Sequence, residues 1–599
     1  MLEKLLPTTD YAALQDVSRD DLINMVVSGG PPAISRIRTA SMITDDQIPE
    51  EGLATDGSLA LEQLNTNTTE YDEQTTEYVV ADDVNALSLS TSRHSSYVGS
   101  SSISAALKVM AILCPDIMKH SSLTAPNSPF DKSERSSLAH VPISRQLEAS
   151  YVDAYFNHVH PIVPMVHEAR FRQRFAAQEP DVDPAWGVLL NVVLTMGSIA
   201  GEPVPDNNHA VFYQRAKAYL SFDLFGSGKL EVVQALALMG GLYLHYCNKP
   251  NMAVAITGAA LRMSYALGLH RRSPSEALGQ GPPATPDGEL ETKRRTWWSL
   301  VCLDTWGSTT LGRPPLGDLS GPAISVSPLS FDDFKDYPIS EQAPALIAFT
   351  GFCTISAQIQ EKLASKPILG LAEAASFDAR LQEHFQNLPP LLRSPNRCPT
   401  NLLVPRAIVK WQHQNARLLL HRPVLLAAAL SHKLPTELSE LEQESLNACR
   451  NLAADSIVDI ACDWQPDPMC GWHAVWYLFQ ASMVPLVSLF YEYTNATECG
   501  KWHSQIDMVL RLLQSMELWS PVAKRTRDVI TELHQSSLLM TSEEPPSRME
   551  SINMHQIWSQ PAPFGFNDDW ANNTWFNFAE WPAFPMETAD FGGPSLFPG

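Results

Sequence analysis

Three histidines stand close together in the segment NHVHPIVPMVHE, at positions 158, 160 and 167. An H-x-H pair with a third histidine seven residues further on could give a zinc ion three imidazole ligands. No carboxylate or cysteine clearly completes the set, and Pro161 and Pro164 split the segment. Capping and core packing are therefore the expected roles of His158, His160 and His167, and we predict no metal site here.

Signatures of other chemistry are missing from the sequence. It contains no G-x-S-x-G elbow, no Walker loop and no H-E-x-x-H motif. Gly279 and Gly281 form a G-x-G, but prolines follow and no strand pattern precedes them, so we assign this segment to a loop. The sequence predicts no catalytic residue and no bound cofactor, so an enzyme or small-molecule-binding protein is the less favoured class.

The stretch RRTWWSLVCLDTWGSTTLGRPP, residues 294–315, combines arginines, paired tryptophans and one aspartate. At 3.6 residues per turn, Trp297, Val301 and Asp304 lie along one side of a helix. Trp297 and Trp298 are adjacent and together can bury a large apolar area. The stretch is therefore typical of a packed core helix, and a cofactor site is the less favoured interpretation.

This predicted helix should end before Gly312, because Pro314 and Pro315 cannot continue it. Asp304 is an acid in an apolar run, and a buried carboxylate needs a cationic or N–H partner. The nearby candidates are Arg294, Arg295 and Arg313. We therefore expect an internal ion pair at Asp304.

The last residues of the chain, 551–599, hold eleven aromatic side chains, five acids and no Lys or Arg. Disordered tails normally lack aromatics, but here the acids keep the rings in water. Trp575, Phe578 and Trp581 are three residues apart and could form one face of a short helix that docks in a partner's groove. This is the chemistry of an acidic transactivation segment; a tail that folds back onto the main domain is the alternative. The candidate activation residues are Trp570, Trp575, Phe576, Phe578 and Trp581.

The charge of the 599-residue chain is concentrated outside its apolar part. Lys and Arg number 42 against 66 Asp and Glu, a net charge of −24, so a broad surface for nucleic acid is excluded. Residues 40–92 hold twelve acids and no Lys or Arg, and residues 541–599 hold eight acids and one arginine. The nine cysteines are scattered without C-x-x-C spacing, as expected of reduced thiols in an intracellular protein.

The elements that must position these residues are predicted to be helices. Residues 141–540 repeat apolar side chains at helical spacing without sustained strand patterns, which predicts a large all-α domain. Short helices are expected at 1–39, a mostly disordered acidic linker rich in Ser and Thr at 40–140, and a disordered acidic tail at 541–599. The uncharged stretch 474–491 contains Gln480, Ser482 and Pro485, so we predict a buried core helix and no membrane span.

Several blocks, taken in order, resemble the regulatory region of the fungal transcription factors that carry a six-cysteine binuclear zinc cluster. They are YVGSSSISAAL, YVDAYFNHVHPIVPMVHEARF, QALALMGGLYLHYCNKPNMAVAITGAALRMSYALGLHRR, ETKRRTWWSLVCLDTWGSTTLGRPP and NARLLLHRPVLL, which together span roughly residues 97–430. Thr305 departs from the family, which usually has a basic residue after the aspartate. The signature positions are Arg294, Arg295, Trp297, Trp298, Asp304, Gly312, Arg313, Pro314, Arg422 and Pro423.

The resemblance implies a nuclear regulator of RNA polymerase II genes whose helical domain restrains or exposes the tail in response to a metabolite or partner. It also implies coactivators bound through the tail, homodimers or heterodimers, and DNA contact through a zinc-cluster module. That module needs repeated C-x2-C-x6-C, which this sequence lacks, so two zinc ions are expected only with an upstream cluster. MLEKLLPTTDY resembles the end of a dimerising coil. The main alternative is a co-regulator or dominant inhibitor without a DNA-binding module.

Overall fold

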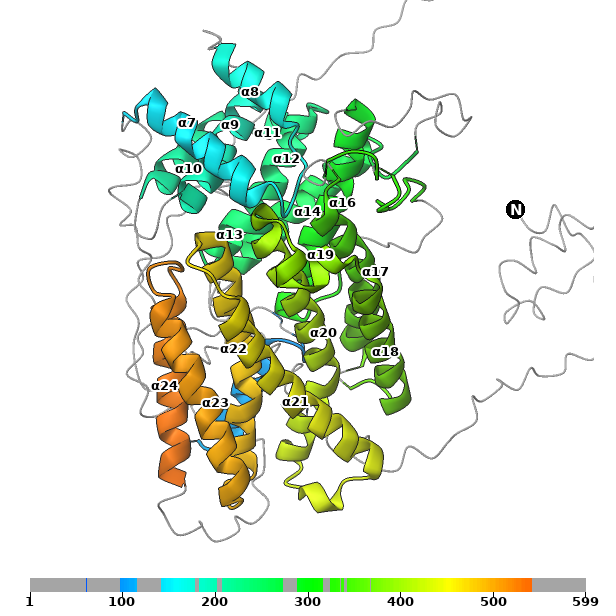
Figure 1. Cartoon of the computed structure of the whole chain (residues 1–599), viewed down its shortest axis with the longest axis vertical. Coiled ribbons are helices and arrows are strands. Elements are labelled where there is room, and N and C mark those ends of the chain that lie inside the picture. Colours follow the sequence, from blue (N-terminus) through cyan, green and yellow to red (C-terminus); the bar gives the residue numbers. More distant parts are fainter. Residues whose placement is uncertain are drawn as a thin grey trace, which may run out of the picture. The chain divides into compact units, whose positions relative to one another are not determined.

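The structure, a computed structural model, describes residues 61, 97, 99–115, 142–177, 183–201, 207–272, 288–315, 324–333, 335–338, 342–366 and 368–540. These residues belong to one compact unit of the chain, residues 1–542. Every regular element among them is a helix, so the all-α prediction is confirmed for this part of the chain. Figure 1 shows the arrangement.

The first group of helices runs from the N-terminal part to the middle of the chain. They are α4 (Ile103–Leu113), α7 (Arg145–Ala154), α8 (Glu168–Ala177), α9 (Pro184–Gly201), α10 (Asn208–Tyr219), α11 (Phe222–Phe225), α12 (Leu230–Leu238), α13 (Leu244–Tyr246), α14 (Pro250–Ala266) and α16 (Glu289–Leu311). Two π-helical turns, η2 (Tyr155–Val159) and η3 (Met239–Tyr243), extend α7 and α12.

The second group completes the described part. It consists of α17 (Pro344–Ser365), α18 (Leu371–Asn387), α19 (Pro390–Arg393), α20 (Leu403–Leu430), α21 (Glu440–Asp463), α22 (Pro468–Tyr491), α23 (Ala496–Ser515) and α24 (Ala523–Met540). Three short 3-10 turns, η4 (Pro395–Arg397), η5 (Thr400–Leu402) and η6 (Pro435–Glu437), lie in the connections.

The buried apolar side chains form two large clusters, and helices α20 and α22 contribute to both. One cluster draws on α7 to α19, and the other on α4 and α20 to α24. Helix α20 contributes to both, with Ile408 and Ala416 in the first cluster and Trp411 and Leu425 in the second. In Figure 1, α7 to α12 gather at one end and α20 to α24 at the other. A displacement of α20 would therefore be felt in both clusters.

Within the described part of the chain, two helices, α9 and α22, are long and apolar enough to cross a membrane. Their 18-residue apolar windows are 83% and 89% buried inside the fold, which is typical of core helices. Side chains around the whole circumference of α22 are covered, which explains why its apolar residues show no one-sided pattern. The prediction of a buried core helix at 474–491 agrees with this burial.

Local sequence signals set several helix starts. The Ser439 hydroxyl accepts from the backbone N–H of Glu442, whose carboxylate accepts from the Ser439 N–H, so α21 begins with a capping box. Asp467 caps α22 by accepting from the N–H of Cys470 at 2.9 Å. These starts, which depend on neighbours in sequence, fix where each chain segment enters the core.

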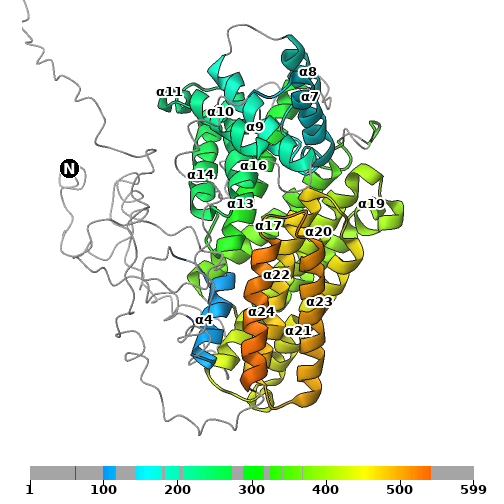
Figure 2. The ribbon, with the colours of Figure 1, turned by 90° about the vertical axis from the view of Figure 1, so that its left-hand side faces the viewer.

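Helix α4 lies beside helices that follow it by some 300 residues. It packs against α20 and α22, and its apolar face, with Val109 and Met110, belongs to their cluster. Figure 2 shows α4 beside this end of the bundle. Residues 99–113, which fall inside the predicted linker at 40–140, are thus part of the packed core.

Candidate functional site

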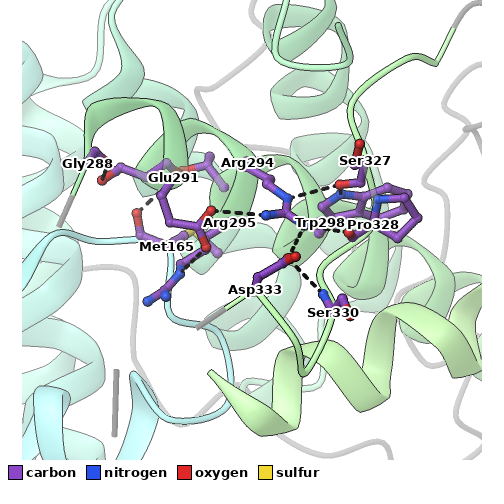
Figure 3. A network of polar contacts seen from close by, with 12 residues as sticks. Met165, Gly288, Glu291, Arg294, Arg295, Trp298, Ser327, Pro328, Ser330 and Asp333 are labelled. Atoms are coloured by element: carbon purple, nitrogen blue, oxygen red, sulfur yellow. Dashed lines mark hydrogen bonds and ion pairs between the residues drawn. The ribbon is translucent and has the colours of Figure 1, made fainter. Parts of the chain in front are cut away.

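A buried carboxylate organises the first turns of α16. Glu291 Oε1 lies 2.8 Å from Arg295 Nε, and Glu291 Oε2 lies 3.4 Å from Arg294 Nη1 (Figure 3). Burial raises the pKa of Glu291, and the two arginines oppose this by stabilising the carboxylate. Both arginines of the signature are therefore held by an acid one turn earlier in the same helix.

Arg294 also fixes the loop at 324–333. Its guanidinium donates to the carbonyl oxygens of Ser327 and Pro328 and lies 2.6 Å from Asp333 Oδ2. The indole N–H of Trp298 donates to the same Ser327 carbonyl at 3.0 Å. Figure 3 shows these bonds converging on the loop, so this arginine is a structural clamp.

The middle of α16 faces the core, as the sequence pattern predicts. Trp297 is fully buried and meets the ring of Tyr265 edge-on at 5.2 Å. Asp304 is also buried, and the Thr305 hydroxyl donates to the carbonyl of Val301. The ion pairs described for Arg294 and Arg295 are with Glu291 and Asp333, whereas our expected pairing of an arginine with Asp304 stays a prediction.

Helix α16 ends where its sequence predicts, at Gly312. This residue adopts φ +66°, and a Cβ atom there would lie 2.8 Å from the Cα of Gly99. Arg313 then donates to the Tyr97 carbonyl and to Asn251 Oδ1, each at 2.9 Å. Pro314 follows and is exposed. The Gly-Arg-Pro signature thus anchors the segment that leads into α4.

Arg422, in the middle of α20, ties α4 to α22. It is fully buried, donates to the carbonyl oxygens of Ser101 and Ser102, and donates to Gln480 Oε1 at 2.8 Å. Burial lowers the pKa of Arg422 to about 10, so the guanidinium remains charged at neutral pH. Pro423 follows it inside the same helix and is also buried.

The three clustered histidines each bond to a different partner. His158 Nδ1 lies 2.9 Å from Asp467 Oδ2, and His160 Nε2 lies 2.8 Å from the carbonyl oxygen of Val166. The ring of His167 accepts from the N–H of Arg170 at 3.4 Å, at the start of α8. Among the described residues no group of three or more metal-ligating side chains occurs.

A cavity of about 120 Å³ lies between α16, α20 and α22. Side chains from α13, α17 and α24 complete its wall. The lining residues that carry rings or polar groups are His245, Asn248, Trp306, Thr309, Thr310, Phe352, Gln412, Asn415, Trp472, His473, Trp476, Tyr477, Phe479, Gln480 and Thr526. None of its lining residues is Asp, Glu, Lys or Arg, so the wall combines aromatic surface with uncharged polar groups.

Three buried polar atoms of residues that line the cavity have no hydrogen-bond partner. Gln412 Oε1 and Asn415 Oδ1 are acceptors on α20, and Gln480 Nε2 is a donor on α22, whereas the Trp306 indole lies within hydrogen-bonding reach of the Cys353 thiol. Burial lowers the pKa values of His245 and His473 to about 4, so both rings are neutral at pH 7. An apolar pocket with a few convergent polar groups is the usual form of a small-molecule site.

The candidate activation residues Trp570, Trp575, Phe576, Phe578 and Trp581 lie outside the described residues. The cavity was not predicted from the sequence. Its only sequence signal is the presence of amides in helices that are otherwise apolar, of which Gln480 in the stretch 474–491 is the clearest.

The family model described as fungal specific transcription factor domain matches residues 152–365. The lactose regulatory protein LAC9 of Kluyveromyces lactis is 24% identical over 70% of this chain and 46% of its own length. The acetamidase regulatory protein of Aspergillus fumigatus is 29% identical over 47% of this chain and 35% of its own. Sorbicillinoid biosynthetic cluster transcription factor 2 of Penicillium rubens is 25% identical over 67% and 62%.

The chain spans less than half the length of the first two of these relatives. No solved structure matches it significantly. The matched domain begins in α7 and ends with α17, so it contains the whole of α16 with its Glu291 network and the Gly312 turn.

Proposed function

We propose that this chain, which carries a fungal specific transcription factor domain at residues 152–365, is the regulatory and transactivation portion of a fungal transcription regulator of RNA polymerase II genes. It acts in the nucleus as a homodimer or heterodimer. The observation that carries the proposal is the family match over α7 to α17, where the signature residues of α16 are structural. Arg294 and Arg295, held by Asp333 and Glu291, fit a scaffold, because their charges are already paired within the fold.

DNA contact, in this proposal, belongs to a six-cysteine zinc-cluster module. The nine cysteines of the sequence do not supply it, because none has C-x2-C spacing. The aromatic residues at 570–581 recruit coactivators, and the helical domain restrains or exposes this segment in response to a small molecule. The names of the relatives, which include regulatory proteins and transcription factors, support the assignment of a role in transcription.

The activation role is tested with the full chain fused to a foreign DNA-binding domain in a fungal reporter strain. Replacing Trp570, Trp575, Phe576, Phe578 and Trp581 together by Ala is expected to lower reporter activity at least fivefold, because the acids alone offer no apolar face to a coactivator groove. The matched control replaces Phe591 and Phe597, aromatics of the same tail outside the cluster, and should keep activity. Equal activity of all three fusions at equal protein level would refute the tail assignment.

A further inference from the structure

We propose that the cavity between α16, α20 and α22 binds an uncharged small molecule with one ring, an apolar face, and both a hydrogen-bond donor and an acceptor. This proposal names the class of small molecule to which the helical domain responds in the proposed function, and in that respect it rests on the proposed function. Binding itself can be measured on the purified chain without any readout of transcription.

The size of the ligand follows from the cavity volume. About 120 Å³ is close to the ~150 Å³ of an engineered apolar cavity that accommodates benzene. Phe352 and Phe479 are buried in the wall, and Trp306 and Trp476 are partly exposed at it. Such rings stack on or meet edge-on the ring of a bound molecule. A single aromatic or aliphatic ring therefore fits, whereas a dinucleotide or a disaccharide does not.

The polarity of the ligand follows from the unpaired atoms. A buried polar atom without a partner is costly, so groups of this kind point to a partner that completes them. The acceptors Gln412 Oε1 and Asn415 Oδ1 call for a donor on the ligand, and the donor Gln480 Nε2 calls for an acceptor. The residues that carry these atoms line the same cavity. An amide, a lactam or an aromatic alcohol carries both groups.

The charge of the ligand follows from the absence of ionised groups among the lining residues. No Lys or Arg lines the cavity to pair a carboxylate or phosphate, and no Asp or Glu lines it to pair an amine. His245 and His473 are neutral at pH 7, so they add no cation. Transfer of an ion into such a site would be strongly unfavourable, which excludes organic acids and amines in their charged forms.

The cavity is connected to α4 through two side chains. Gln480 is one of the residues that line the cavity, its Nε2 has no hydrogen-bond partner, and its Oε1 accepts from Arg422. Arg422 in turn donates to the carbonyls of Ser101 and Ser102, immediately before α4. A ligand acceptor bound to Gln480 Nε2 fixes this amide in the orientation that Arg422 needs, and so strengthens the attachment of α4.

The test uses benzamide as the probe, because it has one ring, an amide donor and an amide acceptor. Binding to the purified full chain is measured by isothermal titration calorimetry and by tryptophan fluorescence, with benzoate and benzene as comparison compounds. We expect benzamide to bind at least tenfold more tightly than benzoate, which is charged, and than benzene, which lacks polar groups. Absence of benzamide binding up to its solubility, or benzoate binding as tightly, would overturn the proposal.

Two variants of α20 localise the binding. Asn415→Leu removes an unpaired acceptor of a residue that lines the cavity. We expect it to weaken benzamide binding at least tenfold and to leave the melting temperature unchanged or higher. Gln414→Leu alters the neighbouring amide, which bonds to Asp459 and does not line the cavity, and should bind as the parent does. If Asn415→Leu does not fold, Gln412→Leu makes the same test. Parent-like binding by a folded cavity variant would place the probe elsewhere and refute the site.

Discussion

Replacing Arg422 by Met tests whether α4 is held by a buried guanidinium. Met has a similar length and fills the apolar part of the site, so the change removes mainly the charge and the hydrogen bonds. The carbonyl oxygens of Ser101 and Ser102 and the amide oxygen of Gln480 lose their donor. Val109, Met110 and the rest of the apolar contact of α4 remain in place.

The expected loss of free energy depends on the hydrogen bonds that the substitution removes and on the desolvation cost that it relieves. A hydrogen bond to a charged group contributes about 1.5–3 kcal/mol, and Arg422 makes three to neutral acceptors. Relief of the buried charge offsets part of this loss, because desolvation of a guanidinium is itself costly. We expect the attachment of α4 to weaken by about 2–3 kcal/mol, which corresponds to roughly 30- to 150-fold more frequent opening.

Hydrogen exchange read by mass spectrometry on the full chain measures this opening. Peptides covering residues 99–113 should exchange roughly 30- to 150-fold faster in Arg422→Met than in the parent chain, whereas peptides of α9 should not change. The matched control is Arg417→Met in the same helix, because Arg417 pairs with Asp378 on α18 and makes no recorded bond to α4. It should accelerate exchange in α18 alone. Unchanged exchange at 99–113 in Arg422→Met, or equal acceleration in both variants, would refute the clamp.

Two further predictions concern the turn after α16 and the buried histidines. Gly312→Ala should lower the free energy of unfolding in urea by about 1–3 kcal/mol more than Gly268→Ala. Both glycines have positive φ, but a Cβ at 312 would strike Gly99, whereas one at 268 meets nothing within 4 Å; equal losses would contradict the contact. His413 is held neutral, since burial lowers its pKa to about 3, and His384 lies beside it. Because the unfolded histidine protonates below about pH 6.5, this group removes about 2 kcal/mol of stability between pH 7 and pH 5. His413→Leu should flatten that fall by a similar amount, and an unchanged slope in urea titrations would show that the ring is charged in the folded chain.

The features that could be predicted from the sequence depend on neighbours along the chain. The end of α16 is set by Gly312 and the prolines after it, and the burial of Trp297 follows from helical spacing. The ion-pair partner of an arginine is harder to predict than a helix end. Several acids lie within reach of the side chain, and the packing of the fold decides which of them it contacts. Glu291, one turn before Arg295, has the spacing of a standard helical ion pair, so this pairing is accessible from the sequence.

The cavity could not be predicted because it belongs to no single segment. Its unpaired atoms come from Gln412, Asn415 and Gln480, which are up to 68 positions apart, and its wall is complete only when α16, α20 and α22 pack. Periodicity identifies the buried face of each helix but gives no information about gaps between the faces. An amide within an apolar run is the one local hint, and it does not distinguish a binding group from a satisfied core residue.

Holding α4 with Arg422 requires a charged guanidinium to be buried, which carries a desolvation cost. Its recorded acceptors, Ser101, Ser102 and Gln480, are all neutral, so the buried cation has less compensation than a carboxylate would give. An apolar residue at this position would carry no desolvation cost, but it would leave the carbonyls of Ser101 and Ser102 without their donor and would make no bond to Gln480. Because Gln480 also lines the cavity, we expect the attachment of α4 to depend on what the cavity contains. In this proposal the buried arginine lowers stability but couples the ligand site to the chain segment before residue 103, through which ligand binding can affect regions outside the helical domain.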